Sequence, residues 1–189
     1  FPENWKYFDL RELTILNEKV IISRSGFSNE LGWEIYFRKN NNTEKVGDHI
    51  LEEGKKMGMI LTGTPGFRCK RIESGLLSAG QDFNYETNQY DVGLGKYVDL
   101  KKNGFIGKSA LMTADKEKRC WGIRVENGTA LKGTYIKFKN EIVGKVTSST
   151  WSPFQKCGVG IVLMNSPKHK PGLIVDVTCN DNKIHKGEI

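Results

Sequence analysis

Hydrophobic and polar positions alternate over the first part of the chain, as expected for strands that are buried on one face. Residues 10–24 predict two short strands with a turn at Asn17-Glu18-Lys19. Residues 33–37 predict a third strand, which the three asparagines at 40–42 would close. The chain therefore begins with short strands joined by turns.

The spacing becomes helical after these strands. We expect Thr43 to cap a helix whose apolar residues recur on one face between residues 46 and 57, and Gly58 to end it. A short strand is predicted at 59–61, before a turn rich in glycine and threonine. This order places a helix between two strands.

The middle of the chain mixes short elements with loops. Pro65 stands where a helix can begin, and the pattern predicts that helix over 67–77. Residues 80–90 have no period and predict a loop. An extended piece is then expected at 92–100 and a short helix at 105–113.

The last third of the chain predicts only strands. Turn residues separate six apolar runs, a spacing typical of a small barrel or sandwich. The charged residues at 114–118 read as a linker, so we expect one domain over 1–115 and a second over 116–189. The fold class is α+β: a partial α/β region followed by a small antiparallel β-barrel. The predicted strands are 119–125, 134–138, 141–148, 157–164, 173–179 and 182–187.

Composition narrows the function classes. No run of residues is long and apolar enough for a membrane span, and no signal segment opens the chain, so we expect a cytoplasmic protein without a membrane partner. The four cysteines form no CxxC pair, which predicts buried reduced thiols and no metal site. Residues 116–189 hold 13 basic and 6 acidic residues, whereas residues 1–115 hold 16 of each. The basic part could steer an anionic partner, or its lysines could serve solubility and protect strand edges.

A carboxylate inside an aromatic strand is the most informative candidate for chemistry. Glu34 lies between Trp33 and Ile35, and by period two Tyr36 points to its own side. Placing a charge there costs desolvation energy unless donors bind it. The paired N–H groups of a pterin or amidine edge suit a carboxylate, and aromatic faces allow stacking. Glu30 is better explained as a solvated charge.

Two arginines near the second predicted helix are further candidates. Arg68 and Arg71, with Glu73, could form an ordinary network on the helix surface, or one arginine could anchor a carboxylate. No GxSxG elbow surrounds a serine, and the glycine pairs lack the full spacing of phosphate-binding loops. The scattered aromatics favour core or pocket-wall roles over nucleic-acid stacking.

Five segments, in order, resemble the glycine-cleavage T-protein (aminomethyltransferase) superfamily, which includes dimethylsulfoniopropionate demethylase-like members. Each segment alone is weakly specific, but five in the same order are strong, and they match the C-terminal half of the family. The segments are RSGFSNELGWE at 24–34, RIESG at 71–75, NQYDVGLG at 88–95, FIGK at 105–108 and GKVTSSTWSP at 144–153.

The resemblance implies a tetrahydrofolate-dependent one-carbon transferase. Glu34 would correspond to the glutamate that binds the pterin, Arg68 would contact polar groups of the cofactor, and Trp33 and Tyr36 would wall the pocket. Phe67 occupies the family's usual arginine position, with Arg68 one place later, and Leu131-Lys132 stands where the barrel often has an arginine. The catalytic aspartate of the family would lie upstream of Phe1.

Several partners remain open. The resemblance implies a small amine or sulfonium donor, with a lipoyl carrier protein as a further candidate, and no nucleic acid or membrane partner. The chain could instead be dimethylsulfoniopropionate demethylase proper, or a folate-binding module without catalysis. An RNA-binding basic barrel is a more distant alternative.

Overall fold

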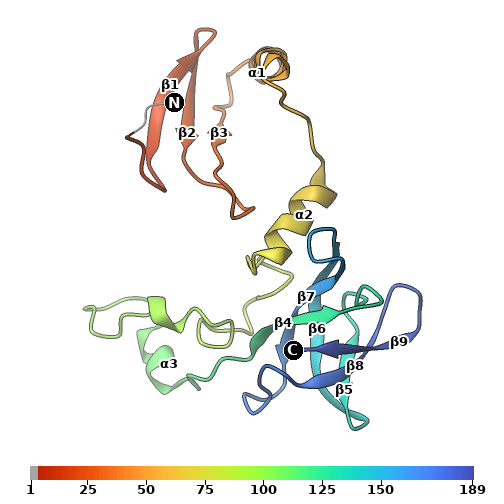
Figure 1. Cartoon of the computed structure of the whole chain (residues 1–189). Helices are drawn as coiled ribbons and strands as arrows, with labels where there is room; N and C mark the ends of the chain where they lie inside the picture. The colour runs from red at the N-terminus through yellow and green to blue at the C-terminus, as the bar shows by residue number, and fades with distance from the viewer. Residues whose placement is uncertain (1–3) are drawn as a thin grey trace. The chain divides into compact units, whose positions relative to one another are not determined.

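The structure is a computed structural model that describes residues 4–189 (Figure 1). The chain divides into two compact units, Phe1–Arg71 and Ile72–Ile189. The domain boundary expected at 115/116 therefore lies inside the second unit. This unit also contains the whole barrel. The assignment of 1–115 and 116–189 as domains stays a prediction.

The first unit contains a three-stranded antiparallel sheet. Strands β1 (Leu10–Ile15), β2 (Glu18–Ser23) and β3 (Glu34–Tyr36) follow one another in space as in sequence. Leu16 and Asn17 both have positive φ, as a two-residue type I′ hairpin turn requires. The turn is thus one residue earlier than predicted, because β2 already begins at Glu18.

Alternation along these strands builds a small core. Trp5, Val20 and Ile22 are buried, and Ile15, Trp33 and Ile35 pack against them. Ile22 lies opposite Ile35 in the β2–β3 register, so both side chains of this pair face the core. The opposite face of β3 is left to Glu34 and Tyr36.

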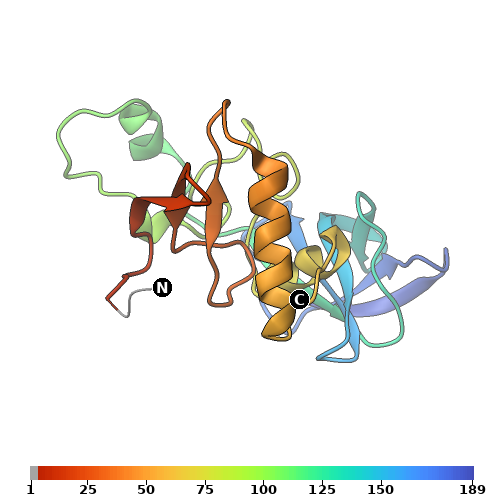
Figure 2. The same cartoon turned by 90° about the horizontal axis from the view of Figure 1, so that it is seen from above.

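Helix α1 (Thr43–Lys56) follows the sheet, seen end-on in Figure 1 and along its length in Figure 2. Asn42, rather than the predicted Thr43, caps it, because the Asn42 side chain accepts a hydrogen bond from the Lys45 N–H (3.1 Å). Gly58 ends the helix as expected, with φ of +81°.

The connection after α1 differs from the prediction. Residues 59–61 form no strand, because no described strand pairs with them. Helix α2 (Thr64–Glu73) begins three residues before the predicted start at 67 and ends four before the predicted end at 77. Pro65 lies in its first turn, where its missing N–H costs no helical hydrogen bond.

The second unit begins with a lobe of loops and short helices. Only η1 (Gly95–Tyr97) and α3 (Lys108–Thr113) are regular there, so the extended piece predicted at 92–100 is wrong and the helix predicted at 105–113 is shorter. Asn88 explains the first difference, because its side chain accepts hydrogen bonds from the N–H groups of Tyr90 (2.8 Å) and Asp91 (3.2 Å). This turn and the positive φ of Gly93 fold the segment back on itself.

The rest of the second unit is a closed six-stranded barrel, as the predicted α+β fold class requires. Its order is β4-β7-β6-β5-β8-β9, with antiparallel pairing throughout. Strand β6 runs four residues further than predicted, since a register shift at Val146/Ser148 bends it and lets it keep its pairing with β7. The strands are β4 (Cys120–Val125), β5 (Tyr135–Phe138), β6 (Glu141–Ser152), β7 (Cys157–Met164), β8 (Ile174–Thr178) and β9 (Ile184–Glu188).

Two carboxylates attach the lobe to the barrel. Asp82, which is 1% exposed, accepts hydrogen bonds from the Ser78 N–H (2.9 Å) and from the Thr147 hydroxyl on β6 (2.6 Å). Glu73 accepts a hydrogen bond from the Ser152 hydroxyl at the end of the same strand. The RIESG and GKVTSSTWSP segments therefore meet through side chains.

Candidate functional site

Glu34 is held at the start of β3 by hydroxyl groups on one side of its carboxylate. The hydroxyls of Ser25 and Tyr36 (3.0 Å) both donate to Oε2. Ser23 lies directly opposite Glu34 across the β2–β3 pair, and its hydroxyl is 2.9 Å from that of Ser25. Because the Ser25 proton goes to the carboxylate, the Ser23 hydroxyl donates to Ser25. Among the described residues, Oε1 accepts no hydrogen bond, so that oxygen can receive a ligand's N–H.

Strand alternation separates the predicted aromatic residues. Tyr36 shares the face of Glu34 and is 48% exposed, as a pocket wall requires. Trp33 instead packs in the core, edge-to-face with Trp5 at a centroid separation of 4.9 Å. The structure thus brings Tyr36 to the carboxylate, whereas Trp33 supports the strand from behind.

The Tyr36–Glu34 hydrogen bond changes the acidity of the phenol. The pKa of Tyr36 is raised above its ordinary value, first because the hydroxyl donates to the Glu34 carboxylate. Partial desolvation and repulsion between a phenolate and the carboxylate act in the same direction. Tyr36 therefore stays a neutral donor over the whole physiological pH range.

The loop between β2 and β3 contacts helix α2. The rings of Phe27 and Phe67 lie 5.9 Å apart, and the Lys70 ammonium is 2.6 Å from the Glu30 carboxylate. Glu30 remains 61% exposed, in keeping with its interpretation as a solvated charge. These contacts, at Phe67 and Lys70, place α2 against the loop that carries Ser25.

The two candidate arginines on α2 differ in environment. Arg68 is exposed, which leaves its guanidinium accessible to a ligand. Arg71 is only 3% exposed and belongs to the interior of the fold. Ser23 and Ser25, which line the Glu34 side of the sheet, were not among the site residues predicted from the sequence. Strand pairing places Ser23 opposite Glu34, but Ser25 lies beyond the end of β2, where the strand period no longer applies.

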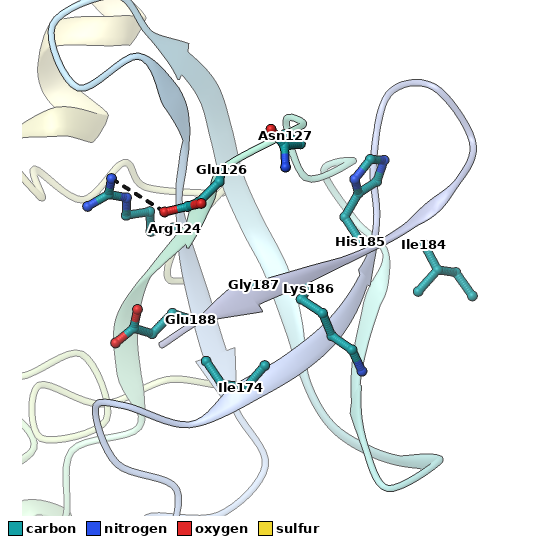
Figure 3. A pocket seen from close by; sticks show the side chains of 9 residues that line it. All are labelled: Arg124, Glu126, Asn127, Ile174, Ile184, His185, Lys186, Gly187 and Glu188. Atoms are coloured by element: carbon teal, nitrogen blue, oxygen red, sulfur yellow. Dashed lines mark ion pairs between the residues drawn. The ribbon is translucent and has the colours of Figure 1, made fainter.

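A depression lies on the barrel where β9 meets β4 (Figure 3). It measures about 510 Å³, and its lining includes the charged side chains of Arg124, Glu126, Lys186 and Glu188. Several of the lining side chains have polar partners: Arg124 lies 3.9 Å from Glu126, His185 lies 2.9 Å from Asp181, and Lys186 lies 2.6 Å from Asp176. The depression contains none of the predicted site residues.

Within residues 4–189, no group of His, Cys, Asp and Glu side chains could hold a metal ion. The thiols of Cys120, Cys157 and Cys179 are free and buried, and Cys69 is half-buried. None of the described helices has the length and apolarity needed to cross a membrane.

A sequence profile described as the GCVT N-terminal domain matches residues 2–102. The chain belongs to the GCVT family.

Individual relatives extend the likeness over nearly the whole chain. The aminomethyltransferase of Halothermothrix orenii is 29% identical over 191 residues, which is 99% of this chain and 53% of that protein. A probable aminomethyltransferase of Thermococcus gammatolerans is 30% identical over 90% of this chain and 49% of its own length. The chain therefore spans about half the length of the curated relatives it matches.

A solved structure confirms the fold. The crystal structure of glycine cleavage system aminomethyltransferase T from Bartonella henselae matches with a TM-score of 0.76 and 21% identity. The match covers 100% of this chain and 52% of that one. At this identity the likeness establishes the fold, and function has to be argued from the residues.

Proposed function

We propose that this chain is part of a tetrahydrofolate-dependent one-carbon transferase of the aminomethyltransferase type. It would help to move a methyl or aminomethyl-derived group from a small amine or sulfonium donor to tetrahydrofolate. Relatives named aminomethyltransferases support the reaction class. The residue that carries the proposal is Glu34, because a carboxylate with one oxygen held by hydroxyls and the other open fits a ligand edge that presents N–H donors.

The chain's own residues would act mainly by positioning. Glu34 accepts the N–H groups of the pterin edge, and its two hydroxyl partners keep the carboxylate from rotating. Tyr36 offers its ring as a wall beside the carboxylate, and Trp33 stiffens the strand through its packing on Trp5. Arg68 orients polar groups of the cofactor, since its guanidinium is exposed on α2. Holding the reactants in one geometry can supply much of the rate acceleration of a transfer reaction.

A titration of tetrahydrofolate into wild-type and variant protein tests the proposal. Glu34→Gln keeps the shape of the side chain but removes its charge, and we expect the Kd to rise about tenfold or more, because hydrogen bonds to charged groups contribute about 1.5–3 kcal/mol. Glu30→Gln is the matched control, since Glu30 is exposed and pairs with Lys70. Equal affinities for wild type and Glu34→Gln would exclude Glu34 as the pterin ligand.

The donor is assigned by a separate panel. Methylated glycines, dimethylsulfoniopropionate and an aminomethyl group on a lipoyl carrier protein are offered with tetrahydrofolate, and transfer is followed by mass. We expect one donor class to react, in the cytoplasmic setting that the sequence predicts. Folate binding without transfer from any donor would favour the non-catalytic folate-binding module. Displacement of tetrahydrofolate by an oligonucleotide would instead favour the RNA-binding alternative.

A further inference from the structure

The two oxygens of the Glu34 carboxylate are occupied unequally. Each oxygen has two lone pairs, so the group can accept about four hydrogen bonds in total. The hydroxyls of Ser25 and Tyr36 both donate to Oε2, and within residues 4–189 no donor reaches Oε1. Both lone pairs of Oε2 are therefore in use, whereas both lone pairs of Oε1 are open.

A ligand edge with two parallel N–H groups needs one lone pair on each carboxylate oxygen. Guanidinium groups, amidines and the amino-pyrimidinone edge of a pterin all have this form. Oε1 can receive the first N–H at once, but Oε2 can receive the second only after one of its hydroxyl donors has left. Binding of a two-donor edge at Glu34 therefore requires either Ser25 or Tyr36 to give way.

The Ser25 hydroxyl is the better held of the two donors. It accepts a hydrogen bond from the Ser23 hydroxyl (2.9 Å), and Ser23 is only 6% exposed and lies opposite Glu34 across the β2–β3 pair. Moving Ser25 away from Oε2 would disrupt this chain of two hydrogen bonds. It would also force a buried hydroxyl to find a new acceptor, which costs free energy.

The Tyr36 hydroxyl is the donor that can leave. The Tyr36 side chain is 48% exposed, and its hydroxyl donates to the Glu34 carboxylate from the surface of the sheet. Strand β3 is an edge strand with a described partner only on the β2 side, so no neighbouring strand of residues 4–189 holds the ring from the other side. Water can replace the carboxylate as the acceptor of this hydroxyl at little cost.

We propose that Tyr36 is a displaceable internal ligand of Glu34, which fills the lone pair that the second N–H of a two-donor ligand takes. When such a ligand binds, the Tyr36 hydroxyl leaves Oε2 for water, while Ser25 keeps the carboxylate in place. Tyr36 thereby lowers the affinity of two-donor ligands and leaves unchanged that of one-donor ligands, which need only Oε1. The inference rests on the proposed function only in taking Glu34 as the acceptor of a ligand edge.

Calorimetric titration of the 189-residue chain with benzamidine, a two-donor probe unrelated to folate, and with tetrahydrofolate tests this role. Tyr36→Phe keeps the ring but removes the competing donor, so we expect the Kd of both ligands to fall about three- to tenfold, the effect of one ordinary hydrogen bond. The methyl groups of N,N-dimethylbenzamidine leave one N–H on the binding edge. Tyr36→Phe should leave the Kd of this one-donor probe unchanged.

Two control variants separate displacement from a general effect of the substitution. Tyr135→Phe is the matched control, because Tyr135 is 57% exposed on the barrel, and it should bind every probe as the wild type does. Glu34→Gln removes the charged acceptor, so adding Tyr36→Phe to it should no longer tighten binding. Circular dichroism should be the same for both phenylalanine variants and the wild type, since both tyrosines are exposed.

NMR of the chain isotope-labelled at the tyrosine Cζ carbon follows the displacement itself. The Tyr36 resonance, identified by its absence in Tyr36→Phe, should shift when benzamidine is added and stay in place with the one-donor probe. Benzamidine binding that Tyr36→Phe tightens, without any binding of tetrahydrofolate, would support displacement and overturn the folate assignment.

Three results would overturn the displacement proposal. The first is benzamidine binding that Tyr36→Phe weakens or leaves unchanged. The second is a Tyr36 resonance that does not respond to benzamidine although Glu34→Gln abolishes its binding. The third is no binding of either two-donor ligand to the wild type or to Tyr36→Phe.

Discussion

At the residue scale, the hydrogen bond between Tyr36 and Glu34 makes a measurable prediction. Glu34→Gln should lower the pKa of Tyr36 toward its ordinary value, because the amide removes both the charged acceptor and the repulsion that a phenolate would meet. The ultraviolet titration of tyrosinate, with Tyr36→Phe subtracted, isolates this residue from the other tyrosines. An unchanged Tyr36 titration in Glu34→Gln would show that the two side chains do not interact.

The raised pKa of Tyr36 also determines how the free energy of unfolding changes at alkaline pH. A phenol whose folded pKa exceeds its unfolded value stabilises the fold fully below the unfolded pKa, and that contribution is lost as the pH rises through the folded pKa. Tyr36→Phe should therefore flatten the alkaline loss of unfolding free energy, measured by urea titration at several pH values. The effect should be small, because Tyr36 lies at the surface.

Cysteine reactivity is predicted from burial. Burial raises the pKa of the Cys120 thiol from 9.0 to about 11, and the nearby Asp82 carboxylate adds to the shift. Since the thiolate is the reactive form, iodoacetamide near pH 8 should modify half-buried Cys69 well before Cys120. Peptide mass mapping over time orders the sites, and equal rates for both would contradict the folded environment of Cys120.

At the element scale, Asp82 joins the lobe to strand β6. Asp82→Ala removes the acceptor of the Ser78 N–H and leaves the Thr147 hydroxyl only the Ile161 carbonyl (3.0 Å) as an acceptor, so we expect the free energy of unfolding to fall by about 1–3 kcal/mol. Thr147→Val tests the same contact from the barrel side. The two losses should be less than additive in the double variant, and strict additivity would show that the contact contributes nothing.

Strand β7 depends on a close backbone approach. A Cβ at Gly158 would lie 2.0 Å from the carbonyl oxygen of Gly128, and backbone cannot move aside cheaply. Gly158→Ala should cost about 1–3 kcal/mol of unfolding free energy. Gly122→Ala on neighbouring β4 is the control, because its Cβ would meet its nearest atom at 3.9 Å. Denaturant titrations compare the two variants, and equal stabilities would contradict this packing.

Elements were predictable where local sequence and tertiary pairing agree. The six barrel strands are short apolar runs bounded by turn residues such as Asn127-Gly128 and Pro171-Gly172, and each finds a partner in the barrel. Residues 59–61 have the same strand character, but no described strand pairs with them. The segment at 92–100 failed for a local reason, the side-chain hydrogen bonds of Asn88, which periodicity does not reveal.

The candidate site was predictable only where its residues lie on a regular strand. Period-two alternation correctly put Tyr36 beside Glu34, since β3 is a regular strand. It could not show that Ser25 reaches Oε2, because the irregular loop after β2 sets that contact. The assignment of Glu34, Arg68, Trp33 and Tyr36 to folate stays a prediction that the titration above tests.

At the scale of the whole molecule, the two units have very different cores. The barrel buries a cluster of eleven residues that includes Ile136, Val146 and Val162, whereas the sheet of the first unit buries Trp5, Val20 and Ile22. Hydrophobic stabilisation grows with the apolar area removed from water, so the barrel should be the more stable unit by a wide margin. In the first unit Ile60 and Leu61 also stay exposed to solvent, so their side chains contribute no hydrophobic stabilisation to the fold.

Native-state hydrogen exchange measures this difference directly. In the 189-residue chain alone, amides of β4, β6 and β7 should exchange only through global opening of the barrel, while those of β1, β2 and α1 should exchange through a smaller, local opening. Val162→Ala should speed exchange throughout the barrel and leave β1 and β2 unaffected, because Val162 is fully buried in the barrel core. Uniform protection across both units, with every amide responding to Val162→Ala, would mean that the chain unfolds as one cooperative body.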